Sequence, residues 1–349
     1  GLCCSLQHNM IIRSKAPLRL GLAGGGTDVS PYSDIYGGAI LNATIDMYAH
    51  ATIKPTSDKK VRMSANAINE KIFIAAENQL DSDGPMDLAK GVYNRIVKDF
   101  IKKPLSFELT TFVDAPPGSG LGSSSTLVVA ILGAFVEWLK LPLGDYDIAH
   151  LAYQIEREDL GMHGGKQDQY AATFGGVNYM EFYANNKVIV NPLRIKDAWM
   201  HELAHNVILF STEVSRSSSD IIIRQSENVK KRKSESIKAM HKLKKHSVMT
   251  KEALLKGNID DIGRIFHLGW KPKSAMAGGI SNKKLEHIYG TARRAGATGG
   301  RISGAGGGGF MMFYAPETAK FRVIEALNKL GGKTVKYNFT EHGLKTWTV

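Results

Sequence analysis

The sequence predicts an α+β fold, because segments of strand character and segments of helical character follow one another along the chain. Strand candidates are short, are rich in β-branched residues and are bounded by turn-forming residues. Helix candidates carry apolar residues at intervals of three and four. The 349 residues, 43% hydrophobic and 22% charged, are enough for one large or two medium domains with a full core.

The predicted elements begin at Met10. Residues 10–21 alternate in polarity and predict a first strand that Pro17 interrupts. Further strands are predicted at residues 39–55, 60–64, 105–113, 206–210 and 310–314. Helices are predicted at residues 86–100, 127–139, 145–159, 281–295 and 317–330, and within the polar region 213–258.

Residues 1–9 are interpreted as a leader or a cloning remnant and are set aside. They lack the basic start and apolar middle of a signal peptide. Both cysteines, Cys3 and Cys4, fall in this segment, so the body of the chain has no disulfide and no cysteine metal site. We expect a cytoplasmic protein, since this cysteine usage fits a reducing compartment and no apolar run is long enough to span a bilayer.

A net charge of +12 leaves three classes of anionic partner open: nucleic acid, a membrane surface or a small polyanion. Part of the excess lies in residues 230–245, which hold eight Lys and Arg. Ile237, Met240 and Leu243 recur there at helical spacing, so the segment is interpreted as a helix with a solvated basic face. Aromatic residues are not interleaved, which argues against nucleic-acid binding.

A loop rich in glycine and hydroxyl residues, 116–126, stands between a strand candidate and a helix candidate. Its glycines bring backbone N–H groups close to a ligand, and the start of the following helix favours negative charge. We therefore predict a site for a di- or triphosphate, with a structural turn as the alternative. No lysine follows the last glycine as in a P-loop, and Ser123 breaks the G-x-G-x-x-G pattern.

A second glycine loop, residues 21–28, ends on Asp28. The three consecutive glycines, residues 24–26, permit backbone shapes closed to other residues and a close approach to a ligand. The Asp28 carboxylate can accept hydrogen bonds from two neighbouring sugar hydroxyls. A helix N-cap or turn aspartate is an equally good interpretation.

Residues 161–170 combine an acid, a base and two amides in a glycine-rich setting. Asp168 could orient or deprotonate a nucleophilic hydroxyl. Lys166 could hold a substrate anion or the charge that develops during reaction. Taken alone, the segment is more readily interpreted as a surface turn.

A third glycine loop, residues 303–309, contains five glycines and precedes an apolar strand candidate. So many glycines are costly to order, and a flexible linker is the alternative. Because apolar elements flank the loop closely, we predict a packed functional loop.

His201, Glu202 and His205 match the H-E-x-x-H pattern of zinc proteases. That site needs a long helix and a third ligand downstream. The strand candidate at residues 206–210 follows at once, so we assign no zinc chemistry.

The three glycine loops, in this order and with these flanks, resemble the motifs of the GHMP kinases over residues 11–345. Residues 19–28, 116–126 and 303–309 correspond to the first, second and third motif. The resemblance implies an N-terminal ATP-binding domain at 10–190, with the fold of ribosomal protein S5 domain 2. It implies a ferredoxin-like α/β sandwich at 191–349.

The resemblance also implies roles for individual residues. Asp168 matches a catalytic aspartate, and Arg19 a basic residue near the transferred phosphate. Ser124 and Glu156 match ligands of Mg²⁺. The residues implied to bind ATP are Pro117, Gly118, Ser119, Gly120, Leu121, Gly122, Ser123, Ser124 and Ser125. Those implied to bind the substrate are Gly25, Gly26, Thr27, Asp28, Lys166, Gln169 and Gly306.

Within the family, residues 25–28 (Gly-Gly-Thr-Asp) and 164–170 (Gly-Gly-Lys-Gln-Asp-Gln-Tyr) look like those of the bacterial D-glycero-D-manno-heptose 7-phosphate kinases. Galactokinases carry Gly-Glu-His-Thr-Asp in the first motif and no lysine at the place of Lys166. The resemblance implies transfer of the γ-phosphate of ATP to the anomeric hydroxyl of that sugar phosphate, on the way to an activated heptose for a surface glycan.

Two alternatives stay open: a kinase for fucose, galactose or another unphosphorylated sugar, and a catalytically silent sugar-binding relative. The expected partners are the sugar phosphate and ATP, with neither nucleic acid nor a membrane, in a monomer or homodimer.

Overall fold

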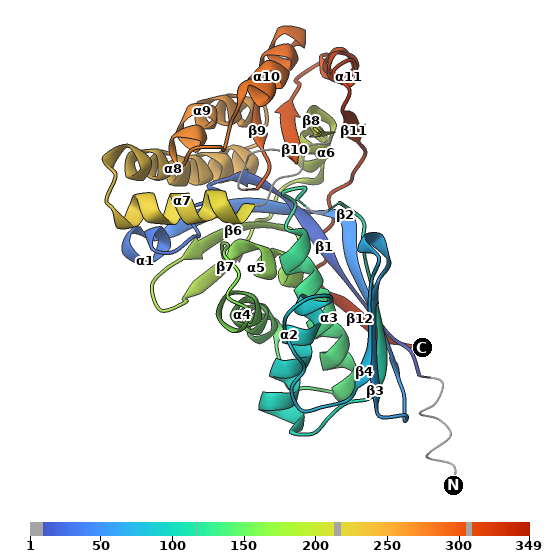
Figure 1. Cartoon of the computed structure of the whole chain (residues 1–349). Helices are drawn as coiled ribbons and strands as arrows, with labels where there is room; N and C mark the ends of the chain where they lie inside the picture. The colour runs from blue at the N-terminus through green and yellow to red at the C-terminus, as the bar shows by residue number, and fades with distance from the viewer. Residues whose placement is uncertain (1–9, 117, 213–217, 305–308) are drawn as a thin grey trace.

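The structure is a computed structural model that describes residues 10–116, 118–212, 218–304 and 309–349. Its strands form two sheets, one of eight strands in the lower part of Figure 1 and one of four strands in the upper part. Helices pack against both sheets (Figure 1), and the predicted α+β fold is confirmed.

The larger sheet has the order β12-β1-β2-β5-β3-β4, with β6 pairing to β2 and β7 to β6. The 18-residue strand β2 organises it, because residues 38–43 pair with β6 and residues 49–55 pair with β5. The strands are β1 Ile12–Ala23, β2 Gly38–Pro55, β3 Lys60–Ala65, β4 Glu70–Ala75, β5 Phe107–Val113, β6 Val177–Phe182, β7 Val188–Pro192 and β12 Lys345–Thr348.

The predicted interruption of the first strand is only a local irregularity. Strand β1 continues through Pro17, and its register on β2 shifts between Pro17 and Arg19. Proline has no N–H to donate to a neighbouring strand, so a shift at this place is expected. The strands predicted at residues 39–55, 60–64 and 105–113 are confirmed as β2, β3 and β5.

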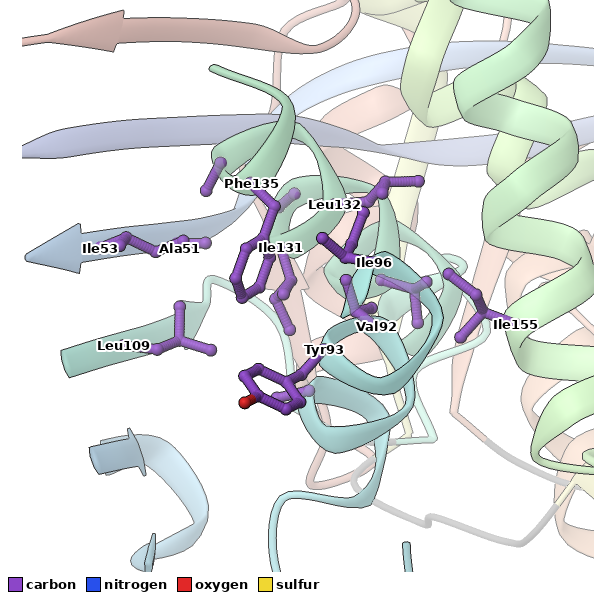
Figure 2. Packing of buried hydrophobic residues seen from close by; sticks show 14 of the residues in the cluster. Ala51, Ile53, Val92, Tyr93, Ile96, Leu109, Ile131, Leu132, Phe135 and Ile155 are labelled. Atoms are coloured by element: carbon purple, nitrogen blue, oxygen red, sulfur yellow. The ribbon is translucent and has the colours of Figure 1, made fainter. Parts of the chain in front are cut away.

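Helices of the first half form one core with the sheet. Figure 2 shows Val92 and Ile96 of α2 close to Leu132 of α3, with Ile53 and Leu109 on neighbouring strands. These helices are α1 Tyr32–Tyr36, α2 Asp87–Ile96, α3 Ser123–Leu139, α4 Asp145–Gln154 and α5 Gln167–Phe174. Single π-helical turns, Val97–Ile101 and Ile155–Asp159, extend α2 and α4, and a 3₁₀ turn, Asn66–Ile68, follows β3.

The smaller sheet is antiparallel, has the order β11-β8-β10-β9, and is flanked by helices. Its strands are β8 Val207–Ser211, β9 Gly299–Ile302, β10 Phe310–Tyr314 and β11 Lys333–Val335. The helices of this half are α6 Asp197–Asn206, α7 Ser218–Lys230, α8 Ser234–Lys256, α9 Asp261–Ala275, α10 Lys283–Ala295 and α11 Lys320–Asn328.

Helix α8 confirms the predicted basic face for residues 234–245, but the basic segment is not a single helix, because Lys230 ends α7 and residues 231–233 connect it to α8. Met240 and Leu243 are buried, whereas Lys242 and Lys245 are exposed. The apolar spacing therefore faces the core, and the lysines cover the solvated side.

The last strand of the chain returns to the first sheet. Strand β12 pairs with β1, and Ile11 and Val349 exchange two backbone hydrogen bonds of 3.1 and 2.8 Å. Figure 1 shows β12 beside β1 at one edge of the larger sheet. The division at residue 190 stays a prediction, and β7 spans it.

A shared apolar cluster joins the two halves. It combines Leu18 and Leu20 of β1 with Leu209 of β8, Phe266 of α9 and Met312 of β10, all at most 1% exposed. The two halves therefore meet through packed side chains rather than through a hinge alone. In the part of the chain that the structure describes, no helix has the length and apolar character needed to cross a bilayer.

Candidate active site

A cavity of about 670 Å³ lies where the three glycine loops meet. Its volume is within the range of ordinary small-molecule sites. Residues of the first loop, the second loop, the start of the third loop and helices of the C-terminal half all line it. The structure thus brings together segments that lie up to about 280 residues apart in the sequence.

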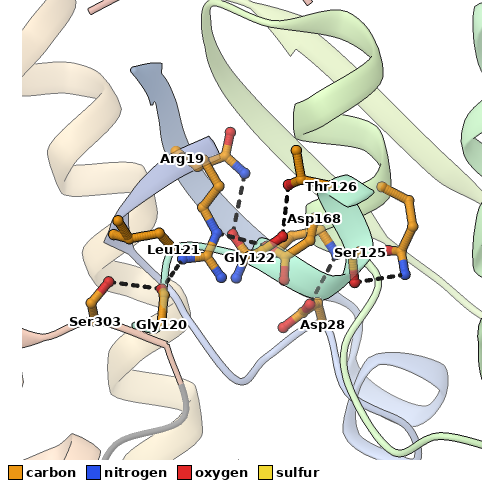
Figure 3. A network of polar contacts seen from close by, with 12 residues as sticks. Arg19, Asp28, Gly120, Leu121, Gly122, Ser125, Thr126, Asp168 and Ser303 are labelled. Atoms are coloured by element: carbon orange, nitrogen blue, oxygen red, sulfur yellow. Dashed lines mark hydrogen bonds and ion pairs between the residues drawn. The ribbon is translucent and has the colours of Figure 1, made fainter. Parts of the chain in front are cut away.

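The second and third loops pack directly on each other. Gly120 has a φ of +79°, and a Cβ there would lie 2.5 Å from the carbonyl oxygen of Ser303. The Ser303 hydroxyl donates a 2.8 Å hydrogen bond to the Gly120 carbonyl (Figure 3), and the Phe310 N–H donates to the Ser119 carbonyl. The described part of the third loop is therefore a packed element, as predicted.

The second loop ends at the N-terminus of α3. Gly122 is the N-cap residue with a φ of +77°, and no side chain caps the helix. The first turn, Ser123 to Ser125, lines the cavity, so the N–H groups that a helix leaves unpaired at its start face this space. Together with the helix dipole, this arrangement favours an anion, in agreement with the predicted phosphate site.

The two ends of the cavity differ in polarity. One end is apolar and suits a flat, weakly polar group. Its lining residues are Ala65, Ile68, Leu88, Phe112, Val113 and Leu127. The other end carries Asp28, Asp168 and several cationic side chains, and it suits a polar or charged ligand.

An ion pair connects Arg19 of β1 to Asp168 of α5. The Arg19 Nε group donates to Asp168 Oδ1 at 2.6 Å, and its Nη1 group donates to the Gly120 carbonyl at 2.6 Å. Arg19 is 4% exposed, whereas the Asp168 side chain keeps 20% of its surface exposed. Figure 3 shows this network beside the second loop, where Gly122 leaves room for the Asp168 carboxylate.

Asp28 caps helix α5 from a distant part of the chain. The N–H groups of Lys166 and Gln167 donate to Asp28 Oδ2 at 2.8 and 3.1 Å. A Cβ at Gly165 would lie 2.0 Å from the same oxygen, so only glycine fits there. Asp28 also lines the cavity. Asp28 is therefore a turn residue that caps a helix far along the chain rather than the N-cap residue of its own helix, and its place in the cavity lining allows contact with a ligand.

Glu156 lies in the π-helical turn after α4, and π-helical turns are frequent at functional sites. The carboxylate is 1% exposed and accepts hydrogen bonds from Gln169 at 2.9 Å and from the Ser124 hydroxyl at 3.4 Å. Arg157 forms an ion pair with it at 3.2 Å.

Ser124 and Glu156 supply the hard oxygen atoms that Mg²⁺ prefers. Among the described residues, no group of three or more His, Cys, Asp or Glu could hold a metal ion. Mg²⁺ at phosphate sites uses one or two carboxylates and completes its coordination with phosphate oxygens and water. This donor set beside an anion-binding helix start therefore fits the ion.

Three of the predicted substrate-binding side chains point elsewhere. Lys166 Nζ lies 3.4 Å from Asp34 Oδ1 and does not line the cavity. Gln169 is fully buried and donates to Glu156 and Ser125. The Thr27 hydroxyl donates to the carbonyl of Gly24 in its own turn and to that of Ala39 in β2. These side chains therefore contact neighbouring protein groups rather than the ligand space, although the buried Gln169 Oε1 atom has no hydrogen-bond partner among the described residues.

The other predicted residues are placed as follows. Gly25 and Gly26 line the cavity, whereas Leu121 is fully buried behind it. Pro117 and Gly306 lie outside the described residues.

Three residues of the C-terminal half line the polar end of the cavity, although no sequence motif contains them. Lys273 donates to the Gly25 carbonyl at 2.9 Å, Arg301 to that of Leu22 at 2.8 Å and Gln225 to that of Gly26 at 2.7 Å. The position of Arg301, two residues before the third loop, is the one signal that could have pointed to any of them.

Both cations show the effect of this enclosure on their basicity. Burial, assisted by the nearby charge of Arg301, lowers the pKa of Lys273 to about 7. Burial and the charge of Arg19 lower the pKa of Arg301 to about 10.

The H-E-x-x-H residues lie outside this site. They fall on α6, which ends at Asn206 immediately before β8. His201 and His205 are both exposed.

Comparison with known proteins decides the family. The model of the GHMP kinases N terminal domain matches residues 87–176, and that of the GHMP kinases C terminal region matches residues 250–333. A Campylobacter jejuni protein named D-glycero-alpha-D-manno-heptose 7-phosphate kinase is 49% identical over 341 residues, which cover 97% of this chain and 99% of that protein. The chain belongs to the GHMP kinases.

Solved structures of other GHMP kinases confirm the predicted two-domain fold. A D-glycero-D-manno-heptose 1-phosphate kinase from Bacteroides thetaiotaomicron superposes with a TM-score of 0.82 at 46% identity, covering 97% of this chain and 99% of that one. A crystal structure of a Campylobacter jejuni protein gives a TM-score of 0.81 at 47% identity, with 97% and 98% coverage. The resemblance found in the three glycine loops is thereby confirmed.

Each of the two matched regions supplies part of the cavity lining. The N-terminal region contains the second loop, Glu156 and Asp168. The C-terminal region contains Lys273, Arg301 and the third loop. The cavity thus needs both family domains to be complete.

Proposed function

We propose that this GHMP kinase transfers the γ-phosphate of ATP to the anomeric hydroxyl of D-glycero-D-manno-heptose 7-phosphate, giving the 1,7-bisphosphate. The 49% identity to the Campylobacter jejuni heptose 7-phosphate kinase over nearly the full length of both chains carries this proposal. The Bacteroides relative is named for the 1-phosphate instead. Both phosphate positions occur in the proposed product.

The shape of the cavity supports ATP at its apolar end. The adenine would lie among Ile68, Leu88 and Phe112, and its triphosphate would follow the second loop to the N-terminus of α3. Backbone N–H groups from residues 118 to 125 would hold the phosphates. Since the reaction consumes ATP and a phosphorylated sugar, we place it in the cytoplasm.

Ser124 and Glu156 would hold Mg²⁺, which when bound neutralises phosphate charge. Gln169 would keep the Glu156 carboxylate oriented, because its amide already donates to that carboxylate at 2.9 Å.

Asp168 would accept the proton of the anomeric hydroxyl. As this hydroxyl oxygen bonds to the γ-phosphorus, the bond from that phosphorus to the bridging oxygen breaks and ADP leaves. Phosphoryl transfer passes through a loose transition state, so the orientation of the hydroxyl matters more than the strength of the base. Arg19 fixes the Asp168 carboxylate and brings positive charge next to the second loop, where charge spreads over the transferred group.

An ATP-consumption assay with Mg²⁺ over a panel of sugars tests the proposal. The panel holds heptose 7-phosphate, unphosphorylated heptose, mannose, fucose and galactose. We expect strong turnover with the 7-phosphate alone. Preferred turnover of fucose or galactose would replace the proposed substrate, and no turnover of any sugar would support a silent sugar-binding relative.

An Asp168→Asn variant tests the proposed base in the same assay. We expect kcat to fall about 10²- to 10⁴-fold, because the amide cannot take up the proton. Asp145→Asn, at an exposed aspartate at the start of α4, is the matched control and should leave kcat unchanged. Unchanged turnover in Asp168→Asn would remove Asp168 from the mechanism.

A further inference from the structure

Two cations at the polar end of the cavity have no carboxylate partner among the residues that the structure describes. The other basic side chains at or beside the cavity are paired: Arg19 with Asp168, Arg157 with Glu156, and Lys166 with Asp34. Lys273 and Arg301 instead donate to backbone carbonyls, and neither forms an ion pair with a described residue. Two positive charges are therefore left without a full counter-charge in an enclosed space.

Two buried cations side by side destabilise the folded protein unless a negatively charged group binds to them. Lys273 is only 8% exposed, and buried charges in proteins are ordinarily paired. Asp28 offers partial compensation through space, but it forms no ion pair with Lys273, and its Oδ2 atom already caps α5. The lowered pKa values of Lys273 and Arg301 agree with this shortage of negative charge.

The tips of the two side chains lie together beside Gly25. A Cβ at Gly25 would be 3.6 Å from Lys273 Nζ and 3.6 Å from Arg301 Nη2. The glycine therefore leaves the space in front of both groups open. Arg301 Nε is also buried and has no hydrogen-bond partner in the described part of the chain. An ammonium next to a planar guanidinium with unused donors is a suitable combination for a phosphate group.

This pair is separate from the loop proposed to hold ATP. Lys273 and Arg301 donate to carbonyls of the first loop, at Gly25 and Leu22, and come from α9 and β9 of the C-terminal half. The second loop and the start of α3 belong to the N-terminal half. An anion held by the pair would sit on the side of the first loop, where Asp28 also lines the cavity.

We propose that Lys273 and Arg301 bind the phosphate that the sugar already carries, and that this pair selects phosphorylated over unphosphorylated sugars. The inference rests on the proposed function, because it needs a substrate that enters with its own phosphate. It assigns the distal phosphate to the C-terminal half, while the N-terminal half holds ATP and the reacting hydroxyl. Specificity is then a property of how the two halves meet.

A purely structural role is the competing explanation. Lys273, Arg301 and Gln225 all donate to carbonyls of the first loop and so hold it to the C-terminal half. Gln225 makes such a contact at 2.7 Å without any charge. A neutral donor is therefore sufficient to hold the first loop to the C-terminal half, a role that we call the clamp. The clamp alone does not explain why two of the three donors carry a positive charge.

The experiment compares Lys273→Gln and Arg301→Gln with the wild-type enzyme on heptose 7-phosphate and on unphosphorylated heptose. Both variants keep hydrogen-bond donors but lose the charge. We expect the KM for heptose 7-phosphate to rise about 10- to 100-fold in each, as for loss of a charge-assisted contact. The KM for ATP and kcat/KM for unphosphorylated heptose should stay within about twofold of wild type.

Two controls separate charge from structure. Gln225→Met removes a clamp contact without changing charge and should alter kcat/KM for both sugars by the same factor. Lys231→Gln removes an exposed positive charge beyond the end of α7 and should change neither. If Arg301→Gln fails to fold, Arg301→Lys and Lys273→Arg keep the charge and should retain the preference for the phosphorylated sugar.

The outcomes separate the inference from the function on which it rests. If wild-type enzyme turns over both heptoses equally well, the proposed function fails and the inference fails with it. If the wild type prefers the 7-phosphate but both variants lose activity equally on the two sugars, the pair is a clamp and only the inference is wrong. A rise in the KM for ATP alone would assign the pair to the nucleotide instead.

Discussion

Lys273 owes its unusual basicity to the side chains that surround it. Burial is the main cause, Arg301 of β9 and Arg19 of β1 add repulsion, and Asp28 of the first loop opposes them. The result is a lysine with a pKa of about 7 in the absence of a ligand. Such a group changes its charge near neutral pH, whereas an exposed lysine stays charged up to about pH 10.

The pH dependence of catalysis should follow the protonation state of Lys273. A phosphate dianion binds the protonated form, so kcat/KM for heptose 7-phosphate should fall as pH rises above about 7. The second ionisation of the sugar phosphate, near pH 6, should limit the rate on the acid side. A pH profile of wild type and Lys273→Arg checks this, since arginine stays charged and should move the falling limb to higher pH. An unchanged limb would show that another group titrates there.

A rise in pH should weaken phosphate binding by Lys273, but it should increase the contribution of this residue to the stability of the fold. Between about pH 7 and the lysine's ordinary value of 10.5, the unfolded chain holds a proton on Lys273 that the folded chain has released. The contribution of this group to the free energy of unfolding therefore rises with pH across that window. The contribution of Lys273 to stability is thus lowest below about pH 7, where its protonated form is ready to bind a phosphate.

At the scale of elements, helix α5 depends on a side chain from the first glycine loop. The helix has no side-chain cap of its own, and Asp28 accepts hydrogen bonds from the N–H groups of its N-cap residue Lys166 and of its first residue Gln167. Asp168 follows directly in the first turn. The contact between Asp28 and the start of α5 therefore fixes the position of Asp168, the candidate catalytic residue, relative to Asp28, which lines the cavity.

Two substitutions at Asp28 should separate its capping role from its charge. Asp28→Ala leaves the start of α5 without an acceptor and should lower the free energy of unfolding by about 1–2 kcal/mol. Asp28→Asn keeps an acceptor oxygen and should lose less than half of that. Urea denaturation measures both values. Equal losses in the two variants would mean that the charge of Asp28, rather than its hydrogen bonds, stabilises the helix.

At the scale of the whole molecule, the shared apolar cluster makes the two halves one folding unit. Phe266 of α9 is 1% exposed and lies in the same cluster as Leu18 and Leu20 of the first sheet. Loss of this ring would leave a cavity against both halves. We therefore expect a destabilising substitution on one side of the cluster to lower the stability of both halves.

Phe266→Ala should lower the free energy of unfolding by about 3–5 kcal/mol, with both halves still unfolding together. Two single-tryptophan proteins report on the halves separately, one keeping Trp138 of α3 and the other Trp270 of α9. Their denaturation curves should coincide. Phe321→Ala, at a ring that is 71% exposed, is the matched control and should change stability little. Separate transitions for the two tryptophans would show that the halves are independent.

The sequence alone determined the parts of this protein that depend on neighbouring residues. The second glycine loop, helix α3 after it and the basic face of α8 follow from local composition and spacing, because backbone freedom, helix dipoles and amphipathicity act over a few residues. The three loops in order were also enough to identify the family. Asp28 had two interpretations, and local pattern could not choose between them.

Only the tertiary structure decided which side chains face the ligand. The family resemblance implied substrate binding by Lys166, yet its burial beside Asp34 turns it away from the cavity. Lys273 and Arg301 sit in no recognisable motif, yet the packing of the C-terminal half on the first loop places both beside Gly25. The physical reason is that the burial of a side chain and the charges around it depend on segments far apart in the chain. The spacing of residues along the sequence does not predict which of these distant segments come into contact.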